Sequence, residues 1–303
     1  MTTATSTTGI AGATESAAPR RAWLGLAPGR RHAIPLFVLL LLGFAAPLLA
    51  VVWFSFIPPR SFDLWQPLSL ANYREIFTES YYRSFLWSLG LAVVATATLA
   101  VICYPVAYGL AKLFGRWANL VTLLLVLPLF VSENVRLYGW VLFFIKGGVL
   151  QGTMKTLFGV DMETWLFTPE MIAFGMVYVY LPFMLFPMTL GISMVPREVT
   201  EAASDLGASR LLIFREVVLP VGIRCSGFGC LLTFVLSVGA IAEAKVLGGQ
   251  SVIVITHDIE IAFTYAQNWP LGAALSVLLM IVVGALVLPV LRRFDLDRVL
   301  GRR

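Results

Sequence analysis

The chain has 303 residues, of which 59% are hydrophobic and only 13% are charged, and its mean hydropathy is +0.86. A soluble domain carries about 25% charged residues, so these values argue against a soluble enzyme, a disordered chain and a secreted domain. Three cysteines are too few for a disulfide framework. The net charge of +5 comes from basic residues that flank apolar runs, which favours membrane orientation over nucleic-acid binding.

Residues 1–32 are rich in Thr, Ala, Ser and Gly at their start, which predicts a disordered cytoplasmic tail. Six apolar runs follow, and each approaches or exceeds the roughly 20 residues that a helix needs to cross a bilayer. The runs are Ala33–Ile57, Phe85–Ala111, Trp117–Ile145, Met171–Ile192, Gly222–Ala242 and Leu271–Leu291. We therefore expect an all-α integral membrane protein, with a six-helix transmembrane domain over residues 33–295 and a cytoplasmic tail over residues 296–303.

The third run contains Pro128 and a polar group that starts at Ser132. It is either a long kinked helix or a span with an irregular outer end. Basic residues set the orientation, since 15 of the 22 Lys and Arg residues lie on the side that holds both termini. That side is predicted to be cytoplasmic.

Residues 195–220 form a polar cytoplasmic loop with the signals of two short helices. Pro196 suits a first helical position, and Gly207 suits the left-handed residue just past a helix end. Ser209 can cap a second helix, which Pro220 is expected to end. From these residues alone, the loop is either an elbow that enters a groove on a soluble partner or a connector packed against its own bundle.

This loop carries Glu201-Ala202-Ala203, then Gly207, and then Leu219-Pro220. The ordered set resembles the EAA loop of binding-protein-dependent ABC importer permeases. In that family the loop forms the coupling helix that docks on the ATP-binding subunit. The resemblance therefore implies a coupling role for Glu201, Ala202, Ala203, Asp205, Gly207, Leu219 and Pro220.

Further segments look like the polyamine-type branch of this family, and together they cover most of the chain. They are Leu70–Tyr73, Tyr104–Tyr108, Tyr180–Phe183, Leu247–Gly249 and Asn268–Ala274. The chain departs from that branch at Ala240 and Ala244, where an acidic residue and a proline are usual. The departure bears on the exact substrate and leaves the family resemblance intact.

The resemblance implies the type I ABC importer permease fold and a multi-pass subunit of the bacterial inner membrane. It implies import of a small solute, with a polyamine such as putrescine or spermidine as the best candidate, by ATP-driven alternating access. The implied partners are paired ATPase subunits on residues 195–220, a second homologous permease chain and a periplasmic solute-binding protein. ATP and Mg²⁺ would bind the ATPase subunits, and we expect no cofactor on this chain.

The alternative is a secondary transporter that is driven by an ion gradient and acts without an ATPase. The absence of a detectable internal repeat argues against it. A catalytic role is disfavoured, because the two histidines form no metal-ligand pair and the Gly147–Lys155 segment lacks Walker spacing. We expect neither catalytic residues nor a metal site.

Polar and aromatic residues near the third to fifth runs are candidates for a substrate pathway. A charge at the bilayer centre costs about 2.5–3.5 kcal/mol, so such groups usually face a cavity or a partner. The candidates are Glu133, Arg136, Tyr138, Trp140, Tyr178, Tyr180 and Glu243. Two other interpretations stay open: that the charges pair with neighbours at the interface, Glu133 with Arg136 and Glu243 with Lys245, and that the rings only pack or face lipid.

Overall fold

The computed structural model describes residues 28–63, 65–160, 163–249 and 251–293. The expected tail over residues 296–303 lies outside this part of the chain, as do residues 1–27 of the expected N-terminal tail. Two compact units divide the chain at residues 49 and 50. The described part of the first unit is most of helix α1, which begins at Pro28, before the expected start of the first span.

Within the described residues every regular element is a helix, and no strand occurs. Three are short turns of other helical types, with π-helical geometry at Gly109–Leu113 and Phe214–Val218 and 3₁₀ geometry at Leu127–Phe130. The α-helices are α1 (Pro28–Phe54), α2 (Ala71–Thr78), α3 (Tyr81–Tyr108), α4 (Trp117–Val126), α5 (Glu133–Phe144), α6 (Val149–Phe158), α7 (Pro169–Ser193), α8 (Arg197–Asp205), α9 (Arg210–Ile213), α10 (Leu219–Val238), α11 (Ala242–Val246), α12 (Ile255–Thr264) and α13 (Trp269–Arg293).

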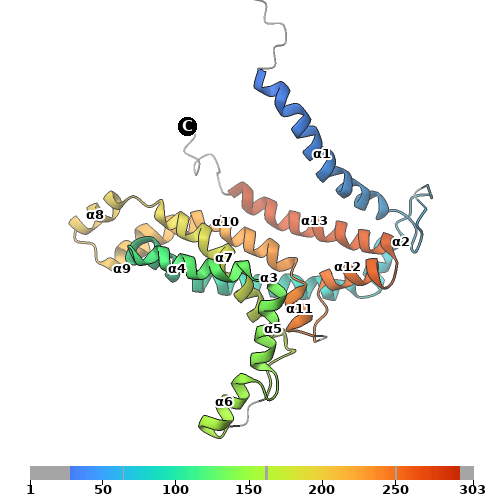
Figure 1. The fold of residues 1–303 in the computed structure, drawn as a ribbon. Coiled ribbons are helices and arrows are strands. Elements are labelled where there is room, and N and C mark those ends of the chain that lie inside the picture. The colour runs from blue at the N-terminus through green and yellow to red at the C-terminus, as the bar shows by residue number, and fades with distance from the viewer. Residues whose placement is uncertain (1–27, 64, 161–162, 250, 294–303) are drawn as a thin grey trace, which may run out of the picture. The chain divides into compact units, whose positions relative to one another are not determined.

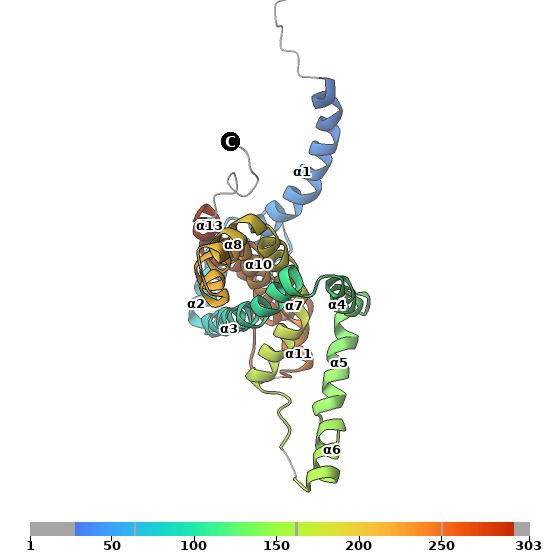
Figure 2. The ribbon, with the colours of Figure 1, turned by 90° about the vertical axis from the view of Figure 1, so that its left-hand side faces the viewer.

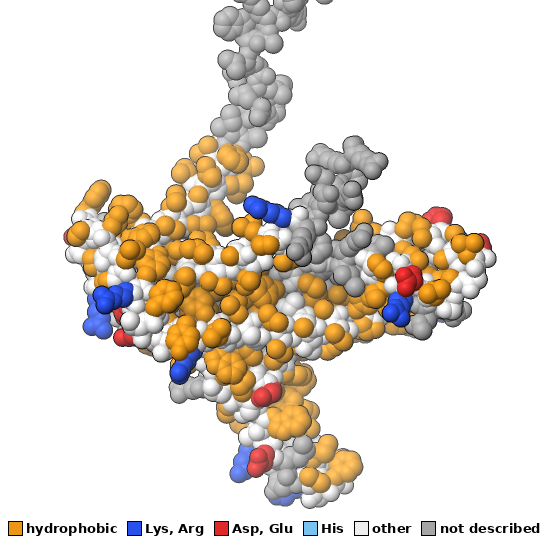
Figure 3. Space-filling model, turned by 180° about the vertical axis from the view of Figure 1, so that it is seen from behind, with side chains coloured by type: hydrophobic (Ala, Val, Ile, Leu, Met, Phe, Trp, Pro, Cys, Tyr) orange, Lys and Arg blue, Asp and Glu red, His pale blue; other side chains and the backbone are white. Residues whose placement is uncertain are grey.

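Four described helices are long and apolar enough to cross a membrane, namely α1, α3, α7 and α13. The pair formed by α4 and α5–α6 makes a fifth candidate if it is one broken span, and α10 adds the shorter apolar segment Gly227–Val238. These six regions correspond to the six apolar runs of the sequence. Hydrophobic side chains cover most of the described surface on the face that Figure 3 shows.

The third apolar run is broken rather than gently kinked. Its helices meet at an angle of 96°, between the 3₁₀ turn that ends at Phe130 and the start of α5 at Glu133. Val131 is extended there, which removes the run from helical geometry. Figures 1 and 2 both show α5 and α6 extending away from the direction of α4. The expectation of an irregular outer end is therefore the better description.

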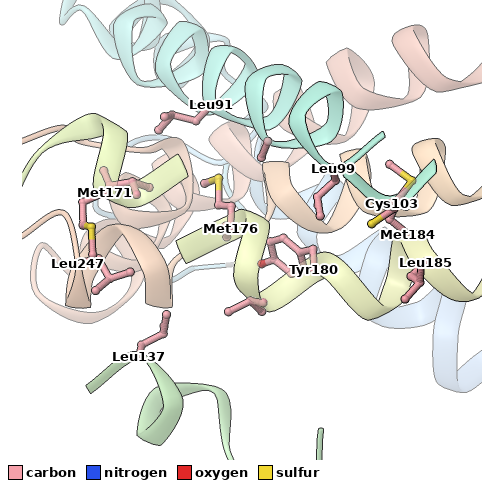
Figure 4. Close-up of a cluster of buried hydrophobic side chains, with 14 of the residues drawn as sticks. Leu91, Leu99, Cys103, Leu137, Met171, Met176, Tyr180, Met184, Leu185 and Leu247 are labelled. Carbon is pink, nitrogen blue, oxygen red and sulfur yellow. The ribbon is translucent and has the colours of Figure 1, made fainter. Parts of the chain in front are cut away.

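Helix α7 is the centre of the second unit and packs most extensively against α3 and α10. Its start follows from local sequence, because the Thr168 side chain accepts a hydrogen bond from the Met171 N–H and Pro169 opens the first turn. The buried side chains of α3 and α7 face each other in Figure 4. Lipid gives little hydrophobic drive between helices, so close packing at small residues holds them together. Gly229 of α10 is one such residue, since an added Cβ would lie 3.2 Å from the Met184 carbonyl oxygen.

A second buried cluster joins α2, α3, α12 and α13 at the end opposite α8 (Figure 1). Two asparagines from the family-like segments fix this end. The buried Asn72 side chain donates hydrogen bonds to the carbonyl oxygens of Ser55 and Ile57, at 3.1 and 2.7 Å. The Asn268 side chain accepts from the Arg60 N–H at 3.0 Å. Both asparagines satisfy backbone groups and therefore have structural roles.

Candidate functional site

The predicted elbow between α7 and α9 is present, and its glycine has the expected geometry. Helix α8 starts at Arg197, with Pro196 as the residue before it rather than as its first residue. Gly207 has a φ of +83°, its N–H donates to the Ser204 oxygen, and the next N–H donates to the Ala203 oxygen. This pair of bonds is the Schellman ending of a helix, which requires a left-handed residue at Gly207.

The second half of the loop differs from prediction at Pro220. Ser209 does cap α9, because its hydroxyl accepts from the Leu212 N–H at 3.3 Å. Pro220 does not end the helical segment, which passes through the π-helical turn Phe214–Val218 directly into α10. A proline ring in an α-helix clashes with the carbonyl four residues earlier and lacks one donor. The wider π-helical turn that precedes Pro220 relieves this conflict.

Contacts from α3 and the turn after it fix both halves of the elbow to the bundle. The Lys112 ammonium donates to the Val195 carbonyl oxygen at 2.8 Å, just before α8. Tyr104 and Tyr108 place their rings edge-on to Phe214, with centroids 5.8 and 5.3 Å away. The family-like Tyr104–Tyr108 segment therefore holds the π-helical turn on the far side of the elbow.

The tip of the elbow is exposed within this chain. Leu206 has an exposed fraction of 89%, although a leucine at a helix end ordinarily packs against something. Among the predicted coupling residues, those on α8 are exposed apart from the half-buried Ala203, while Leu219 is half-buried and Pro220 is exposed. The tip therefore presents one exposed apolar side chain among polar ones.

A cavity of about 730 Å³ lies near the broken third run. Its walls come from the break itself, from α5, from the middle of α7 and from the segment that follows α10. The lining residues with polar or aromatic side chains are Phe130, Ser132, Glu133, Arg136, Tyr180 and Phe183. The volume falls in the range of small-molecule sites, about 300–1,000 Å³.

Glu243 stands on α11, directly after the lining residues Ala240 to Ala242. Its side chain is completely buried, and neither carboxylate oxygen makes a hydrogen bond of normal geometry with any described residue. The Tyr180 hydroxyl lies close enough to interact with it, and Glu133 and Arg136 lie within coulombic range. A buried carboxylate without a partner is costly, and either a proton or a cation offsets that cost.

Arg136 is the nearby cation, and it makes no ion pair within 4 Å among the described residues. Its guanidinium carbon lies 5.7 Å from the centroid of the Tyr178 ring, and its buried Nε has no hydrogen-bond partner within the described ranges. A contact of this kind contributes about 0.5–2 kcal/mol. The simple Glu133–Arg136 pair considered from sequence is therefore not formed in this structure.

The remaining predicted pathway residues are not at the cavity. Tyr138 is 58% exposed and does not line it. Trp140 packs in an aromatic cluster, with ring centroids 4.8 Å from Phe174 and 5.5 Å from Tyr178, so it supports the Tyr178 ring from outside. Lys245 pairs with Glu260 of α12 at 2.6 Å and not with Glu243.

The prediction missed some of the cavity wall. Phe183 lines it one turn after Tyr180 on α7, and the i, i+3 spacing within the Tyr180–Phe183 segment was a signal that placed both on one face. Phe130 and Ser132 also line it, from the break itself. Ser132 opens the polar group of the third run, which was a signal, whereas nothing in the sequence pattern distinguishes Phe130 from a lipid-facing residue.

Comparison with known proteins agrees with this architecture. Residues 110–298 match the family described as binding-protein-dependent transport system inner membrane component. The spermidine/putrescine transport system permease protein PotB of Escherichia coli strain K12 is 34% identical over 221 residues, which cover 73% of this chain and 80% of PotB.

Solved structures show the same fold at lower identity. A bacterial ABC transporter that imports the acidic polysaccharide alginate contains a similar chain, with a TM-score of 0.68 and 15% identity, covering 87% of this chain and 93% of that one. The alginate transporter in complex with its alginate pentasaccharide-bound periplasmic protein gives a TM-score of 0.69 at 16% identity, covering 90% and 94%. With the family match over more than half of its length, the chain belongs to the inner membrane permease components of binding-protein-dependent ABC importers.

Proposed function

We propose that this permease subunit moves a small amine-bearing solute, of the putrescine or spermidine class, by ATP-driven alternating access. The observation that carries the choice of substrate is the buried Glu243 carboxylate beside the cavity, whose oxygens make no hydrogen bond of normal geometry in the described part of the chain. Glu133 adds a second carboxylate at the cavity wall. The relatedness to PotB supports the same substrate class.

An ammonium group suits this site for two reasons. It carries the charge that a buried carboxylate needs, and it can lie over the face of an aromatic ring. Tyr178 does not line the cavity, but its ring makes a contact of this kind with the guanidinium of Arg136, which does. One arginine against two carboxylates leaves a formal excess of negative charge around the cavity.

The proposed coupling site is the α8–α9 elbow, with Glu201, Ala202, Ala203, Asp205 and Gly207 on one side and Leu219 and Pro220 on the other. Both halves of the elbow contact α3 or the turn after it. A displacement of the elbow by an ATPase subunit therefore also displaces the helices of the bundle. The exposed Leu206 supplies an apolar contact for an ATPase subunit. In this arrangement the ATPase subunits perform the hydrolysis, and this chain has no catalytic role.

The remaining partners follow from the family. We propose a second permease chain, a pair of ATPase subunits on the cytoplasmic side and a periplasmic solute-binding protein on the other. The solved alginate transporter with its periplasmic protein supports the last of these. Both termini are proposed to be cytoplasmic, with the elbow on the same side.

Uptake by the whole complex in proteoliposomes tests the substrate. Radiolabelled putrescine and spermidine are compared with succinate, an anion of similar size, in the presence of the solute-binding protein of the complex. The proposal predicts ATP-dependent uptake of an amine and none of the anion. ATP-dependent uptake of succinate alone would overturn the amine assignment and leave the permease family untouched.

A further inference from the structure

The arginine in the cavity is unexpected for a site that admits cations. Arg136 lines the cavity and lies within coulombic range of Glu243, yet it forms no ion pair within 4 Å among the described residues. Its Nε is buried and has no hydrogen-bond partner among the residues that the structure describes. The contact that its guanidinium does make is the one over the Tyr178 ring. Arg136 thus occupies the place that suits an ammonium without being fixed there by a salt bridge.

The Arg136 guanidinium has a second possible partner on its own helix, the Glu133 carboxylate. Glu133 stands three residues before Arg136 at the start of α5, so both side chains lie on one face of that helix. Both line the cavity, and Glu133 makes no ion pair within 4 Å among the described residues. The i, i+3 spacing places the Glu133 carboxylate within reach of the Arg136 side chain.

We infer that Arg136 is a tethered counter-ion, which lies over the Tyr178 ring when the cavity is empty and moves to Glu133 when an alkylammonium group takes its place. This inference rests on the proposed function and specifies how the same site recognises its substrate. The cavity then keeps a cation beside Glu243 in both states. A solute without a cationic group cannot displace the arginine, so the exchange selects for amines.

Competition from Arg136 lowers the affinity of the cavity for its substrate. When a competitor occupies a site for most of the time, the apparent dissociation constant rises by the inverse of the fraction of time for which the site is vacant. Weak binding suits an importer, which must release each molecule that it admits. Glu133 is a positioning residue in this scheme, because it acts on the substrate only through Arg136.

A double-mutant cycle on the purified complex, without the binding protein, tests the exchange. The measured quantity is the dissociation constant of radiolabelled putrescine for the detergent-solubilised complex, by scintillation proximity. Arg136→Gln removes the competitor and should tighten putrescine binding about threefold or more. Glu133→Gln removes the second partner of Arg136 and should weaken binding in the wild-type background. In the Arg136→Gln background the same change should have no effect.

The control substitution is Arg83→Gln, which removes an exposed arginine at the start of α3, outside the cavity lining. It should leave the dissociation constant unchanged. The elution volume on size exclusion and the basal ATPase rate report whether each variant is folded. If Arg136→Gln fails to assemble, it is replaced by Arg136→Lys, which keeps the charge. Arg136→Lys should then weaken the effect of Glu133→Gln, because the ammonium pairs less firmly than the planar guanidinium.

Two results would overturn the inference. If Glu133→Gln weakens putrescine binding equally in both backgrounds, Glu133 contacts the substrate directly and no exchange takes place. If Arg136→Gln weakens binding, the arginine supports the site rather than competing for it. A wild-type complex that binds no putrescine but imports succinate would refute the proposed function together with the inference, which distinguishes that failure from the other two.

Discussion

The elbow and the cavity differ in how their residues come together. The elbow is a contiguous segment between α7 and α10, and its shape follows from caps and one glycine within the loop. The cavity draws its walls from α5, α7 and the segment before α11, which lie far apart in the sequence. We propose that the elbow serves every substrate in the same way and that the cavity distinguishes one substrate from another. Substitutions in the elbow should therefore impair transport of every substrate, and substitutions in the cavity should impair transport of amines.

The largest effect is expected at Gly207. Gly207→Val places a branched side chain at a φ of +83°, which costs about 1–2 kcal/mol of backbone strain, while an added Cβ meets no atom within 4 Å. The elbow should change shape, and the complex should lose its ATPase subunits on co-purification. Gly207→Asn is the matched control, because asparagine tolerates this backbone region. Full retention of the ATPase subunits by Gly207→Val would make the loop a structural connector.

Glu243→Gln should have the next largest effect, confined to amines. The substitution keeps the size and removes the charge that an ammonium needs, so putrescine uptake should fall about tenfold or more, as for other cases of one buried charge left without its partner. Uptake is measured in proteoliposomes, and ATPase subunits should remain bound. Tyr138→Phe, at an exposed tyrosine of α5 away from the cavity, is the control. Normal putrescine uptake by Glu243→Gln would show that the cavity is not part of the substrate pathway.

Gly248→Ala tests how tightly the segment that carries Glu243 is held against α7. An added Cβ would lie 2.4 Å from Ile172 Cδ1 and 2.6 Å from the Ala244 carbonyl oxygen, and the backbone oxygen cannot move aside. Overpacking of this kind costs about 1–3 kcal/mol, so the thermal unfolding temperature should fall. Gly90→Ala on α3, where an added Cβ meets nothing within 4 Å, should leave it unchanged or raised. An equal response of the two variants would contradict the packing described.

The smallest effect is expected at Lys245. Its ion pair with Glu260 lies at the surface, with side chains 39% and 32% exposed, and such pairs contribute about 0–1 kcal/mol. Lys245→Gln should change putrescine uptake little, and any difference should vanish at high salt. A loss of uptake as large as that of Glu243→Gln would show that Lys245, and not Glu243 alone, belongs to the pathway.

The same contrast explains what the sequence could predict. Gly207 and Ser209 were placed correctly because caps depend on a few adjacent residues. The prediction that Pro220 ends the second helix was wrong, because the π-helical turn that accommodates it depends on packing of Phe214 against Tyr104 and Tyr108. That packing joins segments remote in sequence.

At the cavity, Glu133, Arg136, Tyr180 and Glu243 were predicted because polar groups are rare in apolar runs. Tyr138 was also a candidate, as an aromatic side chain of the same run, but it does not line the cavity, since residues two apart on a helix do not share a face. The unpaired state of Arg136 had no sequence signal at all. It depends on how the break after Phe130 directs α5, which no local pattern defines.

The central claim is that coupling and substrate recognition are separate, and the ratio of ATP hydrolysed to putrescine imported tests it most directly. Proteoliposomes with the whole complex and its binding protein give both quantities in one experiment. We predict that Glu243→Gln raises the ratio sharply, because hydrolysis continues while import fails, and that Gly207→Val lowers hydrolysis and import together. An unchanged ratio for Glu243→Gln, with hydrolysis at the wild-type rate in Gly207→Val, would contradict the account.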